Sequence, residues 1–307
     1  MHAAILFLIF NRPDTSKRVF EIIRQVKPLR FYIAADGPRN DEEIEICEKT
    51  RSIIEKIDWD CEVKTLFRKE NLGCGKAVSS ALTWFFDNES EGIILEDDII
   101  PHLDFFPYCE ELLEKYRATD QIYAISGHNH LYGEKANEDS YYFSSICHIW
   151  GWASWRRAWK AYDYSLEAIN KKEFFNILRY YCDKSCYRNF WKLIFFQMKD
   201  HLIDTWDYQW GISLMYNKAL CIIPNTNLTQ NIGFGENATH TKKIKKKILD
   251  YKGRAIFPLK HPQNIFLNRE GDRMDIIKNK RCISDIRYVK RYVLFKLKIL
   301  LNGRFKF

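Results

Sequence analysis

The chain has 307 residues, of which 46% are hydrophobic and 29% charged. This composition is typical of a folded globular protein and excludes an intrinsically disordered or collagen-like chain. The formal net charge of +8 is uneven, because residues 242–307 hold 20 Lys and Arg against 5 Asp and Glu, whereas residues 1–241 hold 28 against 35. We therefore expect an acidic body and a basic tail that meets an anionic partner.

Strand and helix patterns alternate over the first 125 residues. Short apolar runs predict strands, and apolar residues spaced by three and four predict helices. The predicted strands are 3–10, 30–35, 62–67 and 92–95, and the predicted helices are 15–26, 41–57, a helix that follows 71–76 and runs to 86, and one that starts at 104. Strands separated by helices indicate an α/β fold with a mostly parallel sheet, whose ligands bind beyond the carboxyl ends of the strands.

After residue 126 the pattern is less regular and more aromatic. Residues 150–159 hold four tryptophans, which we expect to be mostly core or cover for the sheet. A polar helical region at 171–201, a short strand at 219–223 and a loop rich in Gly and Asn at 225–241 follow.

The nine cysteines include no CxxC pair, which argues against a zinc ribbon or finger. The longest apolar run, at 3–10, is too short to span a bilayer, and no basic region precedes it as in a signal peptide. We therefore expect a location in a reducing cytoplasm.

Three consecutive acids, Glu96, Asp97 and Asp98, follow the predicted strand at 92–95. Adjacent carboxylates repel one another unless a cation or hydrogen-bond donors offset their charge. Mn²⁺ or Mg²⁺ does this, typically with one or two carboxylates and the phosphates of a substrate as ligands. The alternative is a solvated acidic turn before the next helix.

Asp207 is a candidate general base, because it stands between Trp206 and Trp210 and partial desolvation there would increase its basicity. The alternative is an acid at the surface that caps a helix start, with Asp204 or Asp207 as the capping residue.

Two further stretches of the chain hold residues that could bind a phosphate or a metal ion. The turn Gly73-Cys74-Gly75-Lys76 enters a helix and could cradle a phosphate, although Ala77 stands where a P-loop has Ser or Thr. In the loop at 225–241, His240 could bind a metal or a diphosphate. Lys76 and His240 could equally be ordinary surface side chains.

Several motifs occur in an order that resembles the GT-A glycosyltransferases, and within them the inverting N-acetylglucosaminyltransferase I type. The motifs are Phe10-Asn11-Arg12, Ala35-Asp36-Gly37, Ile94 to Asp98, Asp104-Phe105-Phe106, Trp206 to Trp210, and Gly233-Phe234-Gly235 through Thr239-His240. The resemblance covers residues 3 to about 241. It implies a Rossmann-like GT-A fold with a nucleotide-sugar half at 1–125 and an acceptor half at 126–241, and leaves 242–307 as a basic helical extension.

The resemblance also implies roles for single residues. A metal ion, Mn²⁺ or Mg²⁺, would be bound by Asp98, with His240 as the second candidate metal ligand from the residue pattern above, and Asp207 would be the general base. Thr239 and His240 would belong to a loop that closes over the diphosphate. Asp36 would face the uracil of a UDP-linked donor. The expected donor-binding residues are Asn11, Arg12, Asp36, Lys76, Glu96, Asp97 and Thr239. The implied activity is inverting transfer of a sugar from a nucleotide diphosphate to a hydroxyl of a glycan, in the synthesis of bacterial surface polysaccharide.

Other functions stay open at this stage. A sugar nucleotidylyltransferase has a related sheet and also uses acids with Mg²⁺, but it usually has a Gly-rich loop after its first strand, where this chain has Asn11 to Asp14. A protein that only binds nucleic acid or carbohydrate would explain the basic tail. It would give the acidic body and the acids 96–98 no purpose, so we expect no nucleic-acid partner.

The last 25 residues predict a basic amphipathic helix, which could lie on an anionic membrane surface and bring the enzyme to a lipid-linked glycan. The alternative is a C-terminal helix that packs on the body. The predicted apolar stripe of this amphipathic helix consists of Tyr288, Tyr292, Phe295, Ile299 and Asn302. Leu294, Leu297, Leu300 and Leu301 broaden the stripe, and the basic side chains that flank it are Arg287, Lys290, Arg291, Lys296 and Lys298.

Overall fold

The computed structural model describes residues 1–181, 184–233 and 252–303. Its strands are β1 (Ala4–Ile9), β2 (Arg30–Ala35), β3 (Glu62–Phe67), β4 (Glu91–Glu96), β5 (Ile99–Pro101), β6 (Ile122–Ser126), β7 (Tyr141–Ser144), β8 (Trp152–Trp155), β9 (Leu220–Pro224) and β10 (Thr229–Asn231). Its α-helices are α1 (Pro13–Val26), α2 (Ile44–Arg51), α3 (Gly73–Asn88), α4 (Phe105–Lys115), α5 (Arg156–Trp159), α6 (Lys171–Tyr181), α7 (Ser185–Lys199), α8 (Asp207–Tyr216), α10 (Arg269–Lys278) and α11 (Asp285–Gly303).

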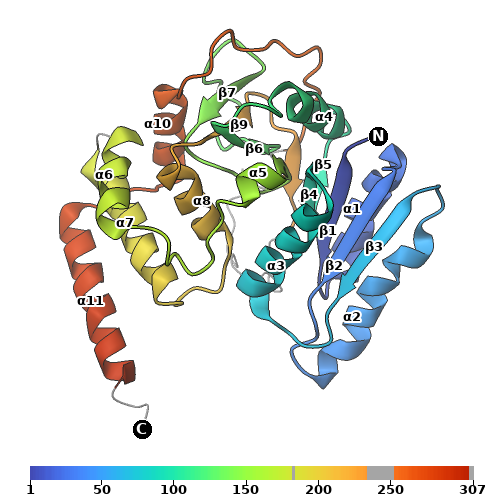
Figure 1. Ribbon diagram of the computed structural model, residues 1–307, viewed down its shortest axis with the longest axis horizontal. Coiled ribbons are helices and arrows are strands. Elements are labelled where there is room, and N and C mark those ends of the chain that lie inside the picture. Colours follow the sequence, from blue (N-terminus) through green and yellow to red (C-terminus); the bar gives the residue numbers. More distant parts are fainter. Residues whose placement is uncertain (182–183, 234–251, 304–307) are drawn as a thin grey trace.

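Eight strands form one sheet in the order β3-β2-β1-β4-β8-β6-β9-β7, and β5 pairs with β10 in a small second sheet (Figure 1). The first four strands of this order are parallel, and β6 is parallel to β9. Only β8 and β7 run antiparallel to their neighbours in the large sheet. The prediction of an α/β fold with a mostly parallel sheet flanked by helices is therefore confirmed.

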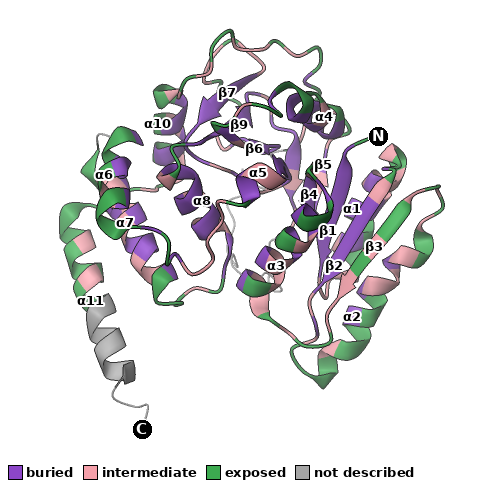
Figure 2. Cartoon of the chain, viewed as in Figure 1, coloured by how far each residue is buried: buried purple, intermediate pink, exposed green. Residues whose placement is uncertain are grey.

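The inner strands of the sheet are apolar on both sides and are buried on both faces, whereas the edge strand β3 is partly exposed (Figure 2). Side chains of α1 and α4 pack on one face in a cluster that includes Phe20 and Leu112. Side chains of α3 and α8 pack on the other face in a cluster that includes Phe85 and Trp210. A third cluster joins α6, α7, α8 and α10. Both halves predicted from the sequence thus contribute strands to a single sheet.

The tryptophan-rich stretch is part of this sheet rather than a cover for it. Its strand β8 lies between β4 and β6, and its side chains alternate between the two faces. Trp152 packs in the cluster with α3 and α8, whereas Ala153 and Trp155 pack in the cluster with α1 and α4. The prediction that these tryptophans are mostly core is confirmed for Trp152, Trp155 and Trp159, which are buried.

The predicted helix at 41–57 is interrupted. A 3-10 turn at Asp41–Glu43 precedes α2, and a second one at Ser52–Lys56 follows it. The side chain of Asn40 accepts a hydrogen bond from Glu43 N and so caps the first 3-10 turn. Of the predicted apolar face, Ile53 is buried but Ile46 is exposed.

The charge boundary at residue 241 does not mark the edge of the packed body. Residues that follow the undescribed 234–251 return to it: Ile256 N donates to Asp104 Oδ2 at 2.9 Å, and Leu267 forms a β-bridge with Phe143. Helix α10 buries Asp275. Residues 252–283 therefore belong to the packed body and not to a basic extension, whereas residues 242–251 of the predicted extension lie outside the described residues. None of the described helices is both long and apolar enough to cross a membrane.

Asp275 anchors this returning segment. Its Oδ2 lies 2.7 Å from Nε2 of His148, and its Oδ1 lies 3.6 Å from Nη1 of Arg281. Burial alone would raise the pKa of Asp275, but the charges of His148 and Arg281 bring it well below its usual range. The stabilisation that this carboxylate confers is therefore present above about pH 4 and is lost as the pH falls below that value.

We expect Asp275→Asn to destabilise the protein by ~3–5 kcal/mol, because it breaks the buried pair of Asp275 with His148 and removes the negative charge that faces Arg281. Thermal denaturation at neutral pH measures this as a melting temperature lower by roughly 6–15 °C. Glu270→Gln, on the same helix but at an exposed position, is the matched control and should melt like the parent. Equal melting temperatures for the two variants would show that the buried pair does not stabilise the fold.

Candidate active site

The acids at the end of β4 meet an arginine that follows β1. These two strands are parallel neighbours, so their carboxyl ends lie at the same edge of the sheet. Arg12 Nη2 donates to Asp97 Oδ1 at 2.5 Å, and its Nη1 donates to Asp98 Oδ2 at 2.8 Å. The structure thus places Arg12, predicted as a donor-binding residue, in contact with two of the three acids.

The three carboxylates outnumber the positive charge that faces them. Burial raises the pKa of Glu96 well above its usual range, and the charges of Asp98 and Asp97 raise it further. Burial also raises the pKa of Asp97 to about 7, although Arg12 opposes this shift. The Oε1 atom of Glu96 is buried and has no hydrogen-bond partner among the described residues. The arrangement can therefore accommodate one more positive charge or hydrogen-bond donor.

The chain after β10 passes directly over Asp98. Ile232 N donates to Asp98 O at 2.8 Å, and Gly233 N donates to Asn231 Oδ1 at 2.8 Å. A Cβ atom at Gly233 would lie 1.9 Å from Asp98 Oδ2, so only glycine fits here. Thr239 and His240, predicted as donor and metal ligands, lie outside the described residues.

Asp36 and Asn11 support loops at this edge. Asp36 accepts hydrogen bonds from the backbone N–H groups of Gly37, Leu72 and Gly73 at 3.0–3.1 Å. Burial raises its pKa, and these bonds only partly offset the shift. Asn11 Nδ2 donates to Glu43 Oε1 at 3.1 Å. Their contacts with a nucleotide stay a prediction.

The interpretation of Gly73 to Lys76 as a phosphate-binding turn is wrong. The backbone N–H groups of Cys74 and Gly75 donate to the carboxylate of Asp204 at 2.8 Å each, so a protein side chain occupies the place of a phosphate. A Cβ atom at Gly73, where φ is +79°, would lie 2.6 Å from Asp204 Oδ2. The glycines therefore allow Asp204 to approach and cap α3. Lys76 is exposed on that helix.

Asp207 starts α8 close to the acid cluster. Its Oδ1 accepts a hydrogen bond from Thr205 Oγ1 at 2.5 Å. Its negative charge contributes to the raised pKa of Glu96. Burial raises the pKa of Cys74 to about 12, and the negative charges of Glu96, Asp204 and Asp207 add to this shift. The flanking Trp206 and Trp210 are buried in the core, whereas Asp207 itself is half-buried. The structure thus brings a partly accessible carboxylate near the acids of β4.

Sequence reasoning missed a basic residue and a group of histidines that lie around Asp275. Burial lowers the pKa of Arg281, but the charges of Asp275 and of more distant groups that include Asp207 raise it overall. His130 stacks on His148 at 4.1 Å and lies 5.0 Å from Trp150. Burial, with the neighbouring His148, lowers the pKa of His130 to about 3. Neither the tail arginine nor the scattered histidines carry a local sequence signal for this cluster.

A search for metal-binding clusters gives no group of three or more His, Cys, Asp or Glu side chains within the described ranges 1–181, 184–233 and 252–303. A complete metal cage built from these residues is therefore absent. A metal ion that takes one or two carboxylates and completes its shell with substrate phosphates and water does not require such a cage.

Comparisons with known proteins show only distant likeness. No family model matches the chain. No curated protein matches it either. Among solved structures, HddC from Yersinia pseudotuberculosis matches 50% of this chain and 77% of its own, with a TM-score of 0.31 and 12% identity. The same values hold for HddC complexed with GMP-PN. TarS 1–349 from S. aureus matches 41% of this chain and 34% of its own, with a TM-score of 0.28 and 13% identity. Likeness at this level carries no information on activity, and the chain spans about a third of the TarS fragment.

Proposed function

We propose that this protein is a metal-dependent glycosyltransferase that moves a sugar, with inversion, from a nucleoside-diphosphate donor to a hydroxyl group of a glycan. One observation carries the proposal: Arg12 clamps Asp97 and Asp98 beside Glu96, whose pKa is raised by burial and by the charges of Asp98, Asp97 and, to a smaller extent, Asp207. The glycan acceptor, the UDP-linked donor and a place in bacterial surface-polysaccharide synthesis follow from the sequence resemblance alone and are part of the proposal.

The donor set at the end of β4 fits a hard divalent cation. Its oxygens are carboxylates, the oxygen ligands that Mn²⁺ and Mg²⁺ prefer. The buried Oε1 of Glu96 without a partner and the raised pKa values of Glu96 and Asp97 are the signs of a site that favours an added cation. Asp98 would hold the ion, which would offset the charge of the leaving diphosphate.

The remaining steps belong to side chains of the chain itself. Arg12 fixes the orientation of Asp97 and Asp98 by its three hydrogen bonds to their carboxylates. Asp207 would accept the proton of the acceptor hydroxyl as that oxygen attacks the sugar. Inversion by single displacement needs one base and no enzyme nucleophile, which agrees with one carboxylate standing apart from the acids of β4.

A panel of nucleotide sugars, incubated with Mn²⁺, Mg²⁺ or EDTA, tests the proposal through the release of nucleoside diphosphate. We expect release from one donor class, stimulated by metal and by a glycan acceptor. A parallel reaction with nucleoside triphosphates and sugar 1-phosphates measures pyrophosphate. Pyrophosphate release there would identify a nucleotidylyltransferase instead. Binding of sugars with no turnover of any donor would indicate a carbohydrate-binding protein.

A further inference from the structure

The first half of helix α11 carries two separate apolar stripes, and only one of them packs on the described part of the protein. Tyr288 and Tyr292 lie on the packed side, where the ring of Tyr292 is 5.0 Å from that of Phe196 on α7. The start of the helix is fastened there too, because Asn189 Nδ2 donates to Asp285 Oδ1 at 2.6 Å. The tyrosine stripe predicted to face a membrane therefore faces α7.

The second stripe is exposed. Ile286 is 84% exposed, Val289 59% and Val293 48%. Their spacing of three and four residues puts them on one side of the helix, and the same spacing continues in the sequence at Leu297 and Leu300. A row of exposed aliphatic side chains on a helix that is anchored to the protein indicates a surface that binds a partner molecule or a membrane.

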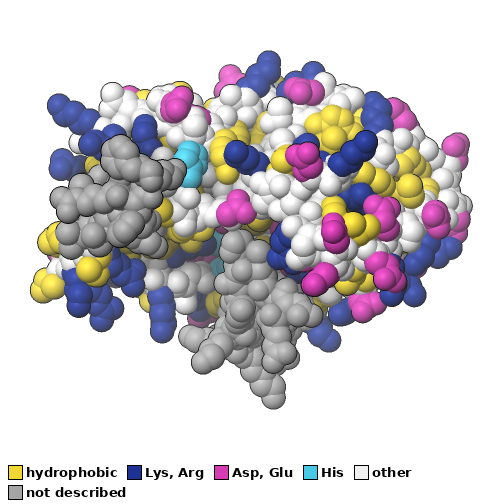
Figure 3. Space-filling view, turned by 90° about the horizontal axis from the view of Figure 1, so that it is seen from below, with side chains coloured by type: hydrophobic (Ala, Val, Ile, Leu, Met, Phe, Trp, Pro, Cys, Tyr) yellow, Lys and Arg dark blue, Asp and Glu magenta, His cyan; other side chains and the backbone are white. Residues whose placement is uncertain are grey.

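The charges around the stripe are basic. The helix holds five Lys and Arg and one Asp, and the exposed Arg287 and Lys290 flank the described part of the stripe. Figure 3 shows hydrophobic side chains beside Lys and Arg at the left-hand end of the molecule. A second copy of the chain would bring this positive charge against itself. A nucleic acid would match the charge but would leave the aliphatic stripe in water.

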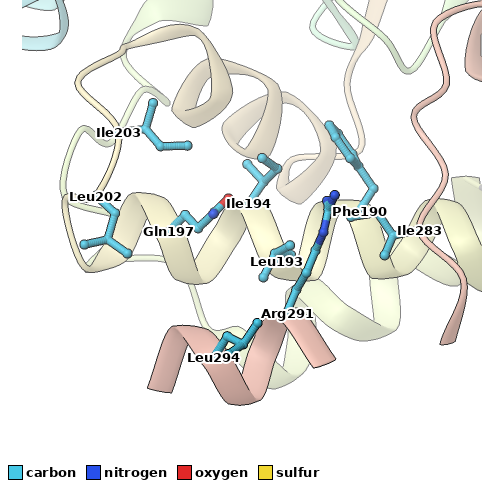
Figure 4. A pocket seen from close by; sticks show the side chains of 9 residues that line it. All are labelled: Phe190, Leu193, Ile194, Gln197, Leu202, Ile203, Ile283, Arg291 and Leu294. Atoms are coloured by element: carbon cyan, nitrogen blue, oxygen red, sulfur yellow. The ribbon is translucent and has the colours of Figure 1, made fainter. Parts of the chain in front are cut away.

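A groove of about 430 Å³ adds apolar surface next to α11. It lies between α7 and α11 and is lined mainly by aliphatic side chains, among them Leu193 and Leu294 (Figure 4). Arg291 reaches from α11 toward Phe190 on α7 in the same view. Leu294 is 56% exposed, so the apolar surface of the groove is continuous with the outside of α11.

We propose that the exposed stripe of α11 binds the surface of an anionic phospholipid bilayer. Ile286, Val289 and Val293 would enter the boundary between headgroups and acyl chains, while Arg287 and Lys290 would contact the anionic headgroups.

Sedimentation of the full chain with vesicles tests this surface independently of any sugar transfer. We expect binding to vesicles of phosphatidylcholine with phosphatidylglycerol, little binding to phosphatidylcholine alone, and weaker binding as salt is added. The triple variant Ile286→Ser, Val289→Ser, Val293→Ser should bind the anionic vesicles ~10-fold or more weakly, because it removes the aliphatic groups that would be buried. The double variant Arg287→Gln, Lys290→Gln should also bind ~10-fold more weakly.

A matched control removes three aliphatic side chains far from α11 that are each about half exposed. These changes are Leu29→Ser, Ile44→Ser and Leu103→Ser, at 49%, 47% and 48% exposure. This control should bind like the parent. If the triple variant of α11 fails to fold, vesicle binding by the double variant Arg287→Gln, Lys290→Gln tests the proposal in its place. Equal binding by the α11 variants and the control would overturn the proposal. So would equal binding to both vesicle types, or light scattering that shows a dimer of the parent which the triple variant loses.

Discussion

Asp98→Asn should lower sugar-transfer turnover by ~100-fold or more, because an amide supplies no negative charge to hold the cation that offsets the leaving diphosphate. The fold should persist. Arg12 keeps its contact with Asp97, and the loss of one carboxylate relieves repulsion with Glu96. Steady-state rates at saturating donor, with and without Mn²⁺, measure the effect, and thermal denaturation checks that the variant is folded.

Asp14→Asn is the matched control for Asp98→Asn, since Asp14 lies in the first turn of α1, close in sequence to Arg12, but is exposed. It should retain the parent rate. Calorimetric titration with Mn²⁺ in the presence of UDP gives a second readout, in which Asp98→Asn should bind the ion much more weakly. A rate near that of the parent, unaffected by EDTA, would mean that the acids of β4 hold no metal.

The parallel half of the sheet could be predicted from the sequence because each of its strands is a compact run of strand-forming residues ended by turn residues. β2 and β3 have the bounds that the sequence predicts. That Arg12 and the acids 96–98 share one edge of the sheet also follows from the sequence, because each of them comes directly after a predicted parallel strand. Their direct contact depends on the pairing of β1 with β4, which the sequence does not show. Strands β5, β7 and β8, with three or four residues each, are too short to show a period and pair antiparallel with distant partners.

Long-range pairs explain the rest of what the sequence could not show. Asp204 caps α3 from 130 residues away, so the glycines at 73 and 75 look like a phosphate-binding turn until their partner is known. Asp275 meets His148 across 127 residues. Net charge likewise predicts a separate tail from 242. The buried acids of α10, Asp272 and Asp275, instead bind this helix to Ser144 and His148 of the body. In each case the local sequence pattern is compatible with two structures, and the observed one is stabilised by a carboxylate that is distant in the sequence.

Asp207→Asn should lower kcat by ~10²–10⁴-fold and leave the affinity for the donor nearly unchanged, because general-base catalysis acts on the acceptor hydroxyl in the transition state. The amide has the size of the carboxylate and can still accept the hydrogen bond from Thr205 Oγ1, so the start of α8 should be preserved. Rates at saturating donor and acceptor, together with donor binding measured without acceptor, separate the two effects.

Two neighbouring acids make this test specific. Asp200→Asn changes an exposed acid that ends α7, and it should alter neither turnover nor stability. Asp204→Asn weakens the cap on α3, and it should lower the melting temperature, since loss of such a cap costs about 1 kcal/mol. A large loss of kcat at Asp207 alone, with an unchanged melting temperature, is the result that a proton-accepting role requires. Unchanged turnover in Asp207→Asn would leave Asp207 with a structural role at the start of α8 and place the base elsewhere.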